Sequence, residues 1–260
     1  MQQISFIKMN GAGNDFIIID ARKNNISFSP AQISSLSSRR NIGCDQFIVI
    51  KNSDNADCFM EIYNSDGSQS KACGNATRCV AKIIMEEKLS DEIEVETLAG
   101  ILNCKKSHDE ISVEMAIPKF GEDFYFNDLK FYTINVGNPH AVCFIDNPLS
   151  DEDFFFISKK VQNDEFFPEQ TNVEFARIAS NNIIEVRVFE RGAGETLACG
   201  TGACAVGAVA IKNKLVSGNK IITRFKGGDL RIDWSGDDSK IIMTGGYKKV
   251  FSGIIDKNFL

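Results

Sequence analysis

The sequence predicts an α+β protein built from two pseudo-symmetric β-rich domains, each wrapped around one central helix. Three observations indicate this fold. A cysteine motif occurs twice, as ACGNAT at 72–77 and as ACGTGA at 198–203. An apolar run with helical spacing follows each copy, and most of the remaining chain consists of short strand-like segments. Because the two copies lie about half a chain length apart, an internal duplication explains the pattern.

Short runs rich in β-branched residues predict the strands. The clearest examples, bounded by Gly, Asn or Asp, lie at 46–50, 93–97, 111–115 and 184–188. Pro118 and the polar segment 121–123 mark a boundary between the halves. The expected domains are therefore 1–117, which contains Cys73, and 118–246, which contains Cys199.

Each cysteine motif opens a predicted helix. Apolar residues recur at intervals of three and four after Cys73, and the same spacing follows Cys199. Unpaired backbone N–H groups and the helix dipole stabilise a thiolate at such a position. Gly74 and Gly200 leave these N–H groups open to a ligand, and a substrate carboxylate is the natural occupant. The sequence thus predicts two acid/base thiols that act on one small molecule.

Composition excludes several other classes of protein. The net charge of −6 argues against a nucleic acid or an anionic membrane as partner. No apolar run reaches the roughly 18–20 residues of a membrane span, and no basic-then-apolar leader starts the chain, so we expect a cytoplasmic protein. Eight cysteines spread through such a chain indicate a reducing compartment.

Neither a metal nor an organic cofactor is expected. The chain has no C-x-x-C pair, no H-E-x-x-H motif and only two histidines, His108 and His140. No lysine stands in a context that favours pyridoxal phosphate. One thiolate would remove a proton from the carbon beside the substrate carboxylate, and the opposite thiol would protonate the other face. The alternative from another class is a thiol redox or metal-binding protein, in which Cys73 and Cys199 form a disulfide.

Longer motifs carry a resemblance to a known family. They read KMNGAGNDF at 8–16, NSDGS at 64–68, CGNATR at 73–78, GNPH at 137–140 and ERGAGETLACGTG at 190–202. In these segments, which run nearly from end to end, the chain resembles the diaminopimelate epimerases. The resemblance implies that family's fold and the cofactor-independent interconversion of LL-2,6-diaminopimelate and meso-2,6-diaminopimelate, in lysine and peptidoglycan precursor biosynthesis.

The resemblance also assigns site residues. Cys73 and Cys199 would be the two acid/base residues, and His140 and Glu190 would adjust their pKa values. Backbone N–H groups of four residues would hold the reacting carboxylate: Gly74, Asn75, Gly200 and Thr201. The rest of the substrate would be held by Asn14, Gln46, Asn64, Asn138, Asn172, Glu190 and Arg191. Arg78 is expected to support the carboxylate pocket or to face solvent. The resemblance further implies a homodimer and a C-terminal tail, 247–260, that packs on the first domain.

Two departures from the family pattern and two rival families bear on this interpretation. Asn10 stands where histidine is common in the family, and Ala76 replaces the glycine that often follows Cys-Gly-Asn. The methyl group of Ala76 would strain the turn if this residue needed a positive φ. Proline racemases share the fold and the paired cysteines, but their second motif typically reads D-R-x-P-C-G-T-G. The sequence ERGAGETLACGTG favours diaminopimelate, and a proline racemase-like activity remains the alternative. Phenazine-type isomerases of this fold lack the cysteine pair.

Overall fold

The computed structural model describes residues 3–24 and 26–256. Backbone contacts divide the chain into two compact units. Unit 1 comprises Met1–Val113 with Gly245–Leu260, and unit 2 comprises Glu114–Thr244. The expected ranges 1–117 with 247–260 and 118–246 stay a prediction for the domains, and residues 257–260 of the expected tail lie outside the described residues.

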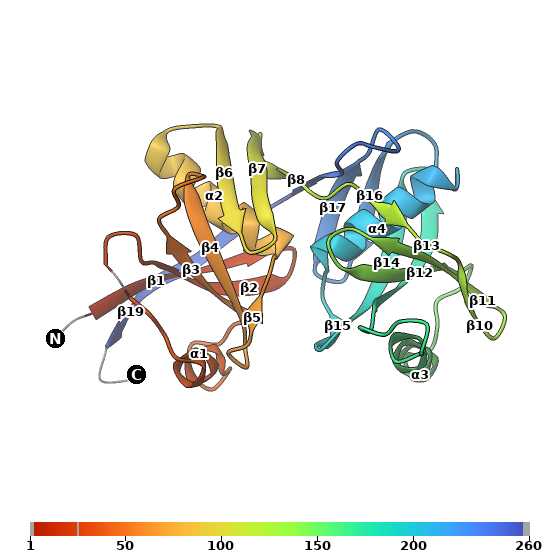
Figure 1. Cartoon of the computed structure of the whole chain (residues 1–260), viewed down its shortest axis with the longest axis horizontal. Helices are drawn as coiled ribbons and strands as arrows, with labels where there is room; N and C mark the ends of the chain where they lie inside the picture. The colour runs from red at the N-terminus through yellow and green to blue at the C-terminus, as the bar shows by residue number, and fades with distance from the viewer. Residues whose placement is uncertain (1–2, 25, 257–260) are drawn as a thin grey trace. The chain divides into compact units, whose positions relative to one another are not determined.

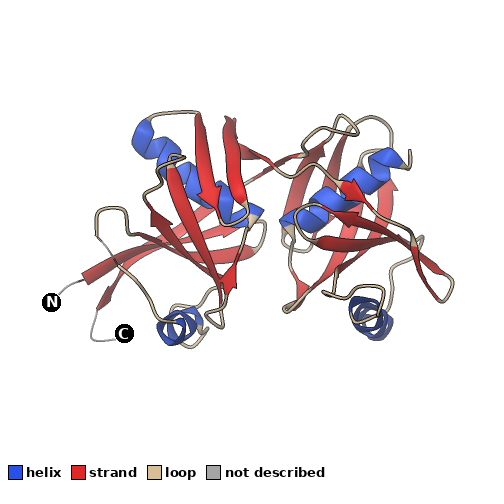
Figure 2. Cartoon of the chain, in the orientation of Figure 1, coloured by secondary structure: helices blue, strands red, loops and turns tan. Residues whose placement is uncertain are grey.

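Both units are rich in strands and contain two helices each in their described residues (Figures 1 and 2). The helices are α1 (Pro30–Ser37), α2 (Gly74–Lys88), α3 (Asp151–Gln162) and α4 (Gly200–Lys212). Helices α2 and α4 are the two that the cysteine motifs predicted. The α+β class is confirmed. No helix in the described ranges combines the length and apolar character needed to cross a membrane.

The strands of unit 1 form one mixed sheet. They are β1 (Gln3–Gly11), β2 (Asn14–Asp20), β3 (Gln46–Lys51), β4 (Cys58–Asn64), β5 (Gln69–Ser70), β6 (Glu92–Thr97), β7 (Gly100–Ser107), β8 (Glu110–Glu114) and β19 (Lys248–Asp256). Their order is β19–β1–β2–β3–β4–β6–β7–β8, with β5 paired to β4. The pairs β2–β3 and β4–β6 are parallel, and the others are antiparallel.

Unit 2 repeats this topology. Its strands are β9 (Lys119–Phe120), β10 (Phe124–Phe126), β11 (Leu129–Asn135), β12 (Pro139–Phe144), β13 (Asn172–Ser180), β14 (Ile183–Glu190), β15 (Gly194–Thr196), β16 (Lys220–Phe225), β17 (Gly228–Asp233) and β18 (Ile242–Gly245). The order is β9–β11–β12–β13–β14–β16–β17–β18, with β15 paired to β14. Here β12–β13 and β14–β16 are the parallel pairs. The predicted pseudo-symmetry is confirmed at the level of strand order.

Each sheet is covered on both faces. Its central strands, β2, β3, β12 and β13, are therefore buried over consecutive residues, whereas β6 and β17 alternate between buried and exposed positions. Helix α2 contacts β1, β2, β4 and β6, and helix α4 contacts β11, β12, β13, β16 and β17. The other face is covered by the short helix of the unit. In unit 1, Ile33 and Leu36 of α1 pack against Ile17 and Phe47. In unit 2, Phe154 of α3 packs into a cluster of phenylalanines with Phe131, Phe175 and Phe189.

Candidate active site

Cys73 is the N-cap residue of α2 in unit 1. Its backbone is extended, at φ −153° and ψ 106°, so that its sulfur folds back over the first turn. The backbone N–H of Ala76 donates to Sγ at 3.5 Å, and the side-chain amide of Asn14 lies 4.0 Å from the same atom. Sulfur here takes the position that a serine or aspartate oxygen usually holds at a helix start. The helix N-terminus therefore stabilises negative charge on this half-buried sulfur.

Cys199 is the matching N-cap residue of α4 in unit 2. Its sulfur accepts a hydrogen bond from the N–H of Gly202 at 3.3 Å and lies 3.4 Å from the hydroxyl of Thr201. Unlike Cys73, Cys199 is almost completely buried. Removal from water therefore shifts the pKa of the Cys199 thiol more strongly than that of the Cys73 thiol.

Burial raises the pKa of Cys199 well above the ordinary value of a thiol. The carboxylates of Glu190 and Glu174 raise it further, while the bonds from Thr201 and Gly202 oppose the shift. A thiolate at this position would lack solvation and would face negative charge. Cys199 is thus held as a neutral thiol near pH 7.

The first turn of α2 rests on a buried arginine. Arg78 has a fully buried side chain, and its guanidinium donates to Oδ1 of Asn75 at 3.0 Å and to the carbonyl of Gly74 at 3.4 Å. Its Nε reaches the carbonyl of Gly246 at 3.3 Å. Of the two roles expected for Arg78, a solvent-facing role does not fit this geometry. Support of the expected carboxylate pocket does fit, because Arg78 binds Gly74 and Asn75. Ala76 lies within the helix and does not have a positive φ, so the strain considered for this position is absent.

Three predicted binding residues of unit 1 stand at the ends of neighbouring strands. Asn14 starts β2, Gln46 starts β3, and Asn64 ends β4 directly opposite Gln46. Nε2 of Gln46 lies 3.3 Å from Oδ1 of Asn64. Within residues 3–24 and 26–256, the buried oxygens Oδ1 of Asn14 and Oε1 of Gln46 have no hydrogen-bond partner. Each can accept a hydrogen bond from a bound cationic group.

Ionic contacts fix the backbone beside two of these residues. Asp15 follows Asn14, Asp45 precedes Gln46, and the N–H of each aspartate donates to a carboxylate oxygen of the other. Arg39 binds Asp15 through both carboxylate oxygens at 2.7 Å, and Lys8 also pairs with Asp15. Burial acts in the opposite direction, but these bonds hold the pKa of Asp15 well below its usual range.

The predicted residues of unit 2 form a connected hydrogen-bonded group. His140 of β12 lies beside Asn172 of β13 in the parallel ladder, and its Nε2 is 3.1 Å from Oδ1 of Asn138. Asn172 bridges two chain segments, since its amide donates to the carbonyl of Pro139 and its oxygen accepts from the N–H of Arg191. The side chain of Arg191 extends outward and donates to the carbonyl of Glu169 at 2.8 Å.

Glu190 connects this group to Cys199. Burial raises the pKa of Glu190, although hydrogen bonds with Thr196 and Cys199 act in the opposite direction. The end of β14 therefore places a carboxyl group directly against the second thiol. The first turn of α4 supplies Gly200 and Thr201, which follow the cysteine as Gly74 and Asn75 follow Cys73.

Glu174 is a site residue that the sequence analysis missed. Its side chain and that of His140 are both fully buried, with Oε1 of Glu174 2.6 Å from Nδ1 of His140. A strand alternates its faces, so Glu174 points to the same side of the sheet as Asn172. A charged residue between apolar neighbours in Asn172-Val173-Glu174-Phe175 was the available signal.

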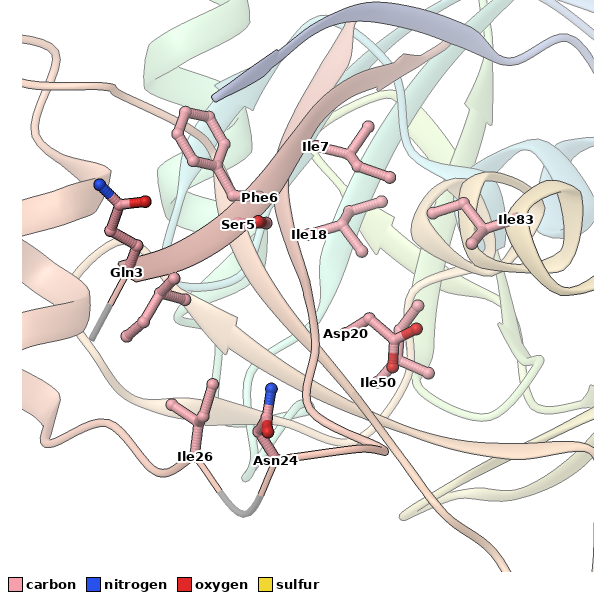
Figure 3. A pocket seen from close by; sticks show the side chains of 11 residues that line it. Gln3, Ser5, Phe6, Ile7, Ile18, Asp20, Asn24, Ile26, Ile50 and Ile83 are labelled. Carbon is pink, nitrogen blue, oxygen red and sulfur yellow. The ribbon is translucent and has the colours of Figure 1, made fainter. Parts of the chain in front are cut away.

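A separate cavity of about 210 Å³ lies in unit 1 (Figure 3). Aliphatic side chains including Ile7, Ile18 and Ile83 line it, and none of the predicted site residues does. Among the described residues, no group of three or more His, Cys, Asp or Glu side chains is arranged to hold a metal ion. The functional interpretation therefore depends on the two cysteine clusters.

Comparison with known proteins decides the family. A sequence model of the family described as diaminopimelate epimerase matches residues 6–120 and 132–250. The chain belongs to the diaminopimelate epimerase family. Among similar members, a diaminopimelate epimerase from Zymomonas mobilis is 41% identical over 97% of both chains. One from Methanococcus maripaludis is 39% identical over 97% of this chain and 100% of its own.

Solved structures with lower sequence identity share the fold of this diaminopimelate epimerase family member. A Bacillus anthracis protein of the PhzF phenazine biosynthesis family has a TM-score of 0.74 at 16% identity, covering 98% of this chain and 99% of its own. A hydroxyproline epimerase from Agrobacterium vitis has a TM-score of 0.70 at 13% identity, covering 97% and 92%. These structures confirm the fold that the sequence predicted.

Proposed function

We propose that this protein interconverts LL-2,6-diaminopimelate and meso-2,6-diaminopimelate without a cofactor, with Cys73 and Cys199 acting on opposite faces of one carbon. Membership of the diaminopimelate epimerase family supports the substrate. The single observation that supports the mechanism is that each unit presents a cysteine as the N-cap of its central helix. A two-base inversion requires such a pair, because one group must remove a proton while another supplies one.

The proposed steps balance without an oxidant or a metal. One thiolate removes the α-proton, and the electron pair of the broken C–H bond is delocalised into the adjacent carboxylate. The other thiol then donates its proton to the opposite face of the carbon. Because burial keeps Cys199 protonated in the substrate-free protein, Cys199 begins as the proton donor and Cys73 as the base. In the reverse direction the two roles exchange.

Backbone dipoles would lower the barrier to proton removal. The carbon beside an amino acid carboxylate is very weakly acidic, so the charge that develops on the carboxylate must be stabilised. We assign this role to the N–H groups of Gly74 and Asn75 and to those of Gly200 and Thr201. These groups belong to first turns of helices, where N–H groups lack partners within the helix and the dipole is positive.

The remaining predicted residues would hold the other charged groups of the substrate. The unpartnered oxygens of Asn14 and Gln46 suit an ammonium group, with Asn64 beside them. In unit 2, Arg191 suits a carboxylate, Glu190 suits an ammonium group, and Asn138 and Asn172 supply amides. We propose that His140 and Glu190 tune the pKa of the thiols. Together these groups match a substrate with two ammonium and two carboxylate groups.

We further propose that the protein acts in the cytoplasm as a homodimer, with a small amino acid as its substrate and with neither nucleic acid nor membrane as partner. The acidic net charge of −6 supports the last two points. Thiol acid/base chemistry also requires reduced cysteines, and a reducing compartment maintains them.

A substrate comparison tests the proposed activity. Purified, reduced protein is incubated separately with LL-diaminopimelate, L-proline and trans-4-hydroxy-L-proline, and the stereoisomers are separated by chiral chromatography. We expect meso-diaminopimelate to form without added pyridoxal phosphate and in the presence of a metal chelator. Turnover of proline alone would favour the racemase alternative, and a dependence on oxidant would favour a redox protein.

A further inference from the structure

The two units differ chemically at one pair of equivalent strand positions. The parallel pair β2–β3 of unit 1 is equivalent to the parallel pair β12–β13 of unit 2. Phe16 lies opposite Gln46 in the first pair, and His140 lies opposite Asn172 in the second, so Phe16 corresponds to His140 and Gln46 to Asn172. Two residues further along each strand, Ile48 occupies the position in unit 1 that Glu174 occupies in unit 2. All four side chains that differ, Phe16, Ile48, His140 and Glu174, are fully buried. Unit 1 thus folds with an apolar pair where unit 2 has an ionisable one.

The carboxylate of Glu174 lies directly under the first turn of α4. A Cβ atom added to Gly202 would be 2.9 Å from Oε1 of Glu174 and 3.2 Å from Cβ of Cys199. Only a glycine at 202 leaves room for this carboxylate beside the thiol-bearing residue. The same oxygen binds Nδ1 of His140, which fixes the carboxylate in place.

The second carboxylate oxygen of Glu174 makes no structural bond. Within the ranges 3–24 and 26–256, Oε2 is buried and has no hydrogen-bond partner. A buried unpartnered carboxylate oxygen destabilises a fold, and an apolar residue at the equivalent position of unit 1 avoids that cost. A buried glutamate with an unpartnered oxygen at this position therefore indicates a role in the chemistry of the site.

We propose that Glu174 is a positioning residue for Cys199, whose buried carboxylate, anchored by His140, favours the protonated thiol in the substrate-free protein and so prepares Cys199 to donate its proton in the direction in which Cys73 is the base. This role rests on the acid/base function proposed for Cys199. Glu174 does not contact the reacting carbon in this proposal. It acts through the charge that it places beside the sulfur.

The groups around Cys199 support this direction of effect. Two carboxylates face the Cys199 thiol, that of Glu190 from β14 and that of Glu174 from β13. Thr201 and the N–H of Gly202 face it from α4 itself. His140 of β12 contacts Glu174 and reaches the thiol only through it. After burial, the two carboxylates are the largest influences that raise the pKa of Cys199. The hydrogen bonds from Thr201 and Gly202 oppose them. Removal of one carboxylate thus shifts the balance toward the thiolate.

The test measures the protonation of Cys199 directly. Wild type and Glu174→Gln are treated with iodoacetamide across a pH series, and mass spectrometry gives the alkylation rate at Cys199 and at Cys73. We expect the midpoint of the Cys199 profile to fall by about one pH unit in Glu174→Gln, because a like charge beside the sulfur is lost. The Cys73 profile is expected to stay unchanged. In the direction in which Cys199 donates the proton, the basic limb of the kcat/KM profile is expected to move to lower pH together with the Cys199 midpoint.

Glu185→Gln is the matched control. It removes one carboxylate from the neighbouring strand β14, where Glu185 pairs with Arg177 and is partly exposed. An unchanged Cys199 midpoint in Glu174→Gln, or an equal fall in Glu185→Gln, would overturn the proposal. If Glu174→Gln does not fold, Glu174→Asp is used instead. Its shorter side chain keeps the charge but places it farther from α4, so the midpoint of the Cys199 alkylation profile must fall, by less than about one pH unit. An absent shift in that variant also contradicts the proposal.

The outcome separates this proposal from the proposed function. A lowered Cys199 midpoint in a protein that does not convert diaminopimelate would support the role of Glu174 and contradict the activity. Normal epimerisation by wild type with no midpoint shift in Glu174→Gln would support the activity and contradict the role of Glu174.

Discussion

Replacement of either Cys73 or Cys199 with alanine is expected to reduce kcat for epimerisation by about 10⁴-fold in both directions, because a positioned acid or base contributes up to that factor. The two variants should lose activity to a similar degree. Each direction of the reaction needs one thiolate and one thiol, so the remaining cysteine cannot complete the inversion alone. Steady-state rates with LL- and meso-diaminopimelate give the result.

Both cysteine variants are expected to remain folded. Each loses an N-cap interaction, which costs about 1 kcal/mol of unfolding free energy. Urea unfolding measures this loss. Cys143→Ala is the matched control, because Cys143 is buried in the sheet of unit 2 and no catalytic role is assigned to it. Full activity in Cys73→Ala or in Cys199→Ala would remove that residue from the mechanism.

Gly202→Ala is expected to lower kcat/KM by about 100-fold while the protein stays folded. The new methyl group would lie 2.9 Å from Oε1 of Glu174, which His140 holds in place, and 3.5 Å from Sγ of Cys199. Something must move, and a displacement of roughly 1 Å at an acid/base group can cost this factor. Rates at several substrate concentrations separate an effect on kcat from one on KM. The effect should fall mainly on kcat if the thiol is displaced.

Gly246→Ala provides the comparison for this variant. A Cβ at Gly246 would meet no atom within 4 Å, and the substitution keeps the backbone carbonyl that accepts from Arg78. We expect near-normal activity from it. Wild-type rates in Gly202→Ala would show that the contact between α4 and Glu174 does not position the thiol.

The motifs predicted the fold and the two cysteine positions because local chemistry determines them. Apolar residues at helical spacing directly after each Cys-Gly pair are a local signal for a helix that begins there. Both helices begin at the residue after the cysteine, Gly74 and Gly200. The duplicated motif also predicted an internal duplication, and the matching strand orders of the two units agree with it.

Side chains that act through long-range contacts were not predictable in this way. Glu174 reads as one polar residue in a strand, and only strand pairing shows that it meets His140 and the first turn of α4. Arg78 lies on a helix, and the sequence of a helix alone does not show which of its faces is buried. The Arg78 side chain is buried because β1 and the segment at Gly246 pack over it. Asp15 pairs with Arg39 and Lys8, which a single sequence cannot place beside it.

The most direct test of the central claim is solvent isotope incorporation at early times. Reduced protein in deuterated buffer converts LL-diaminopimelate, and mass spectrometry follows the deuterium content of substrate and product separately. Two thiols on opposite faces predict one deuterium in newly formed meso product and almost none in the recovered LL substrate, because the proton removed and the proton donated belong to different sulfurs. Equal early labelling of recovered substrate and product would show that one group serves both faces, which would contradict the two-thiol mechanism.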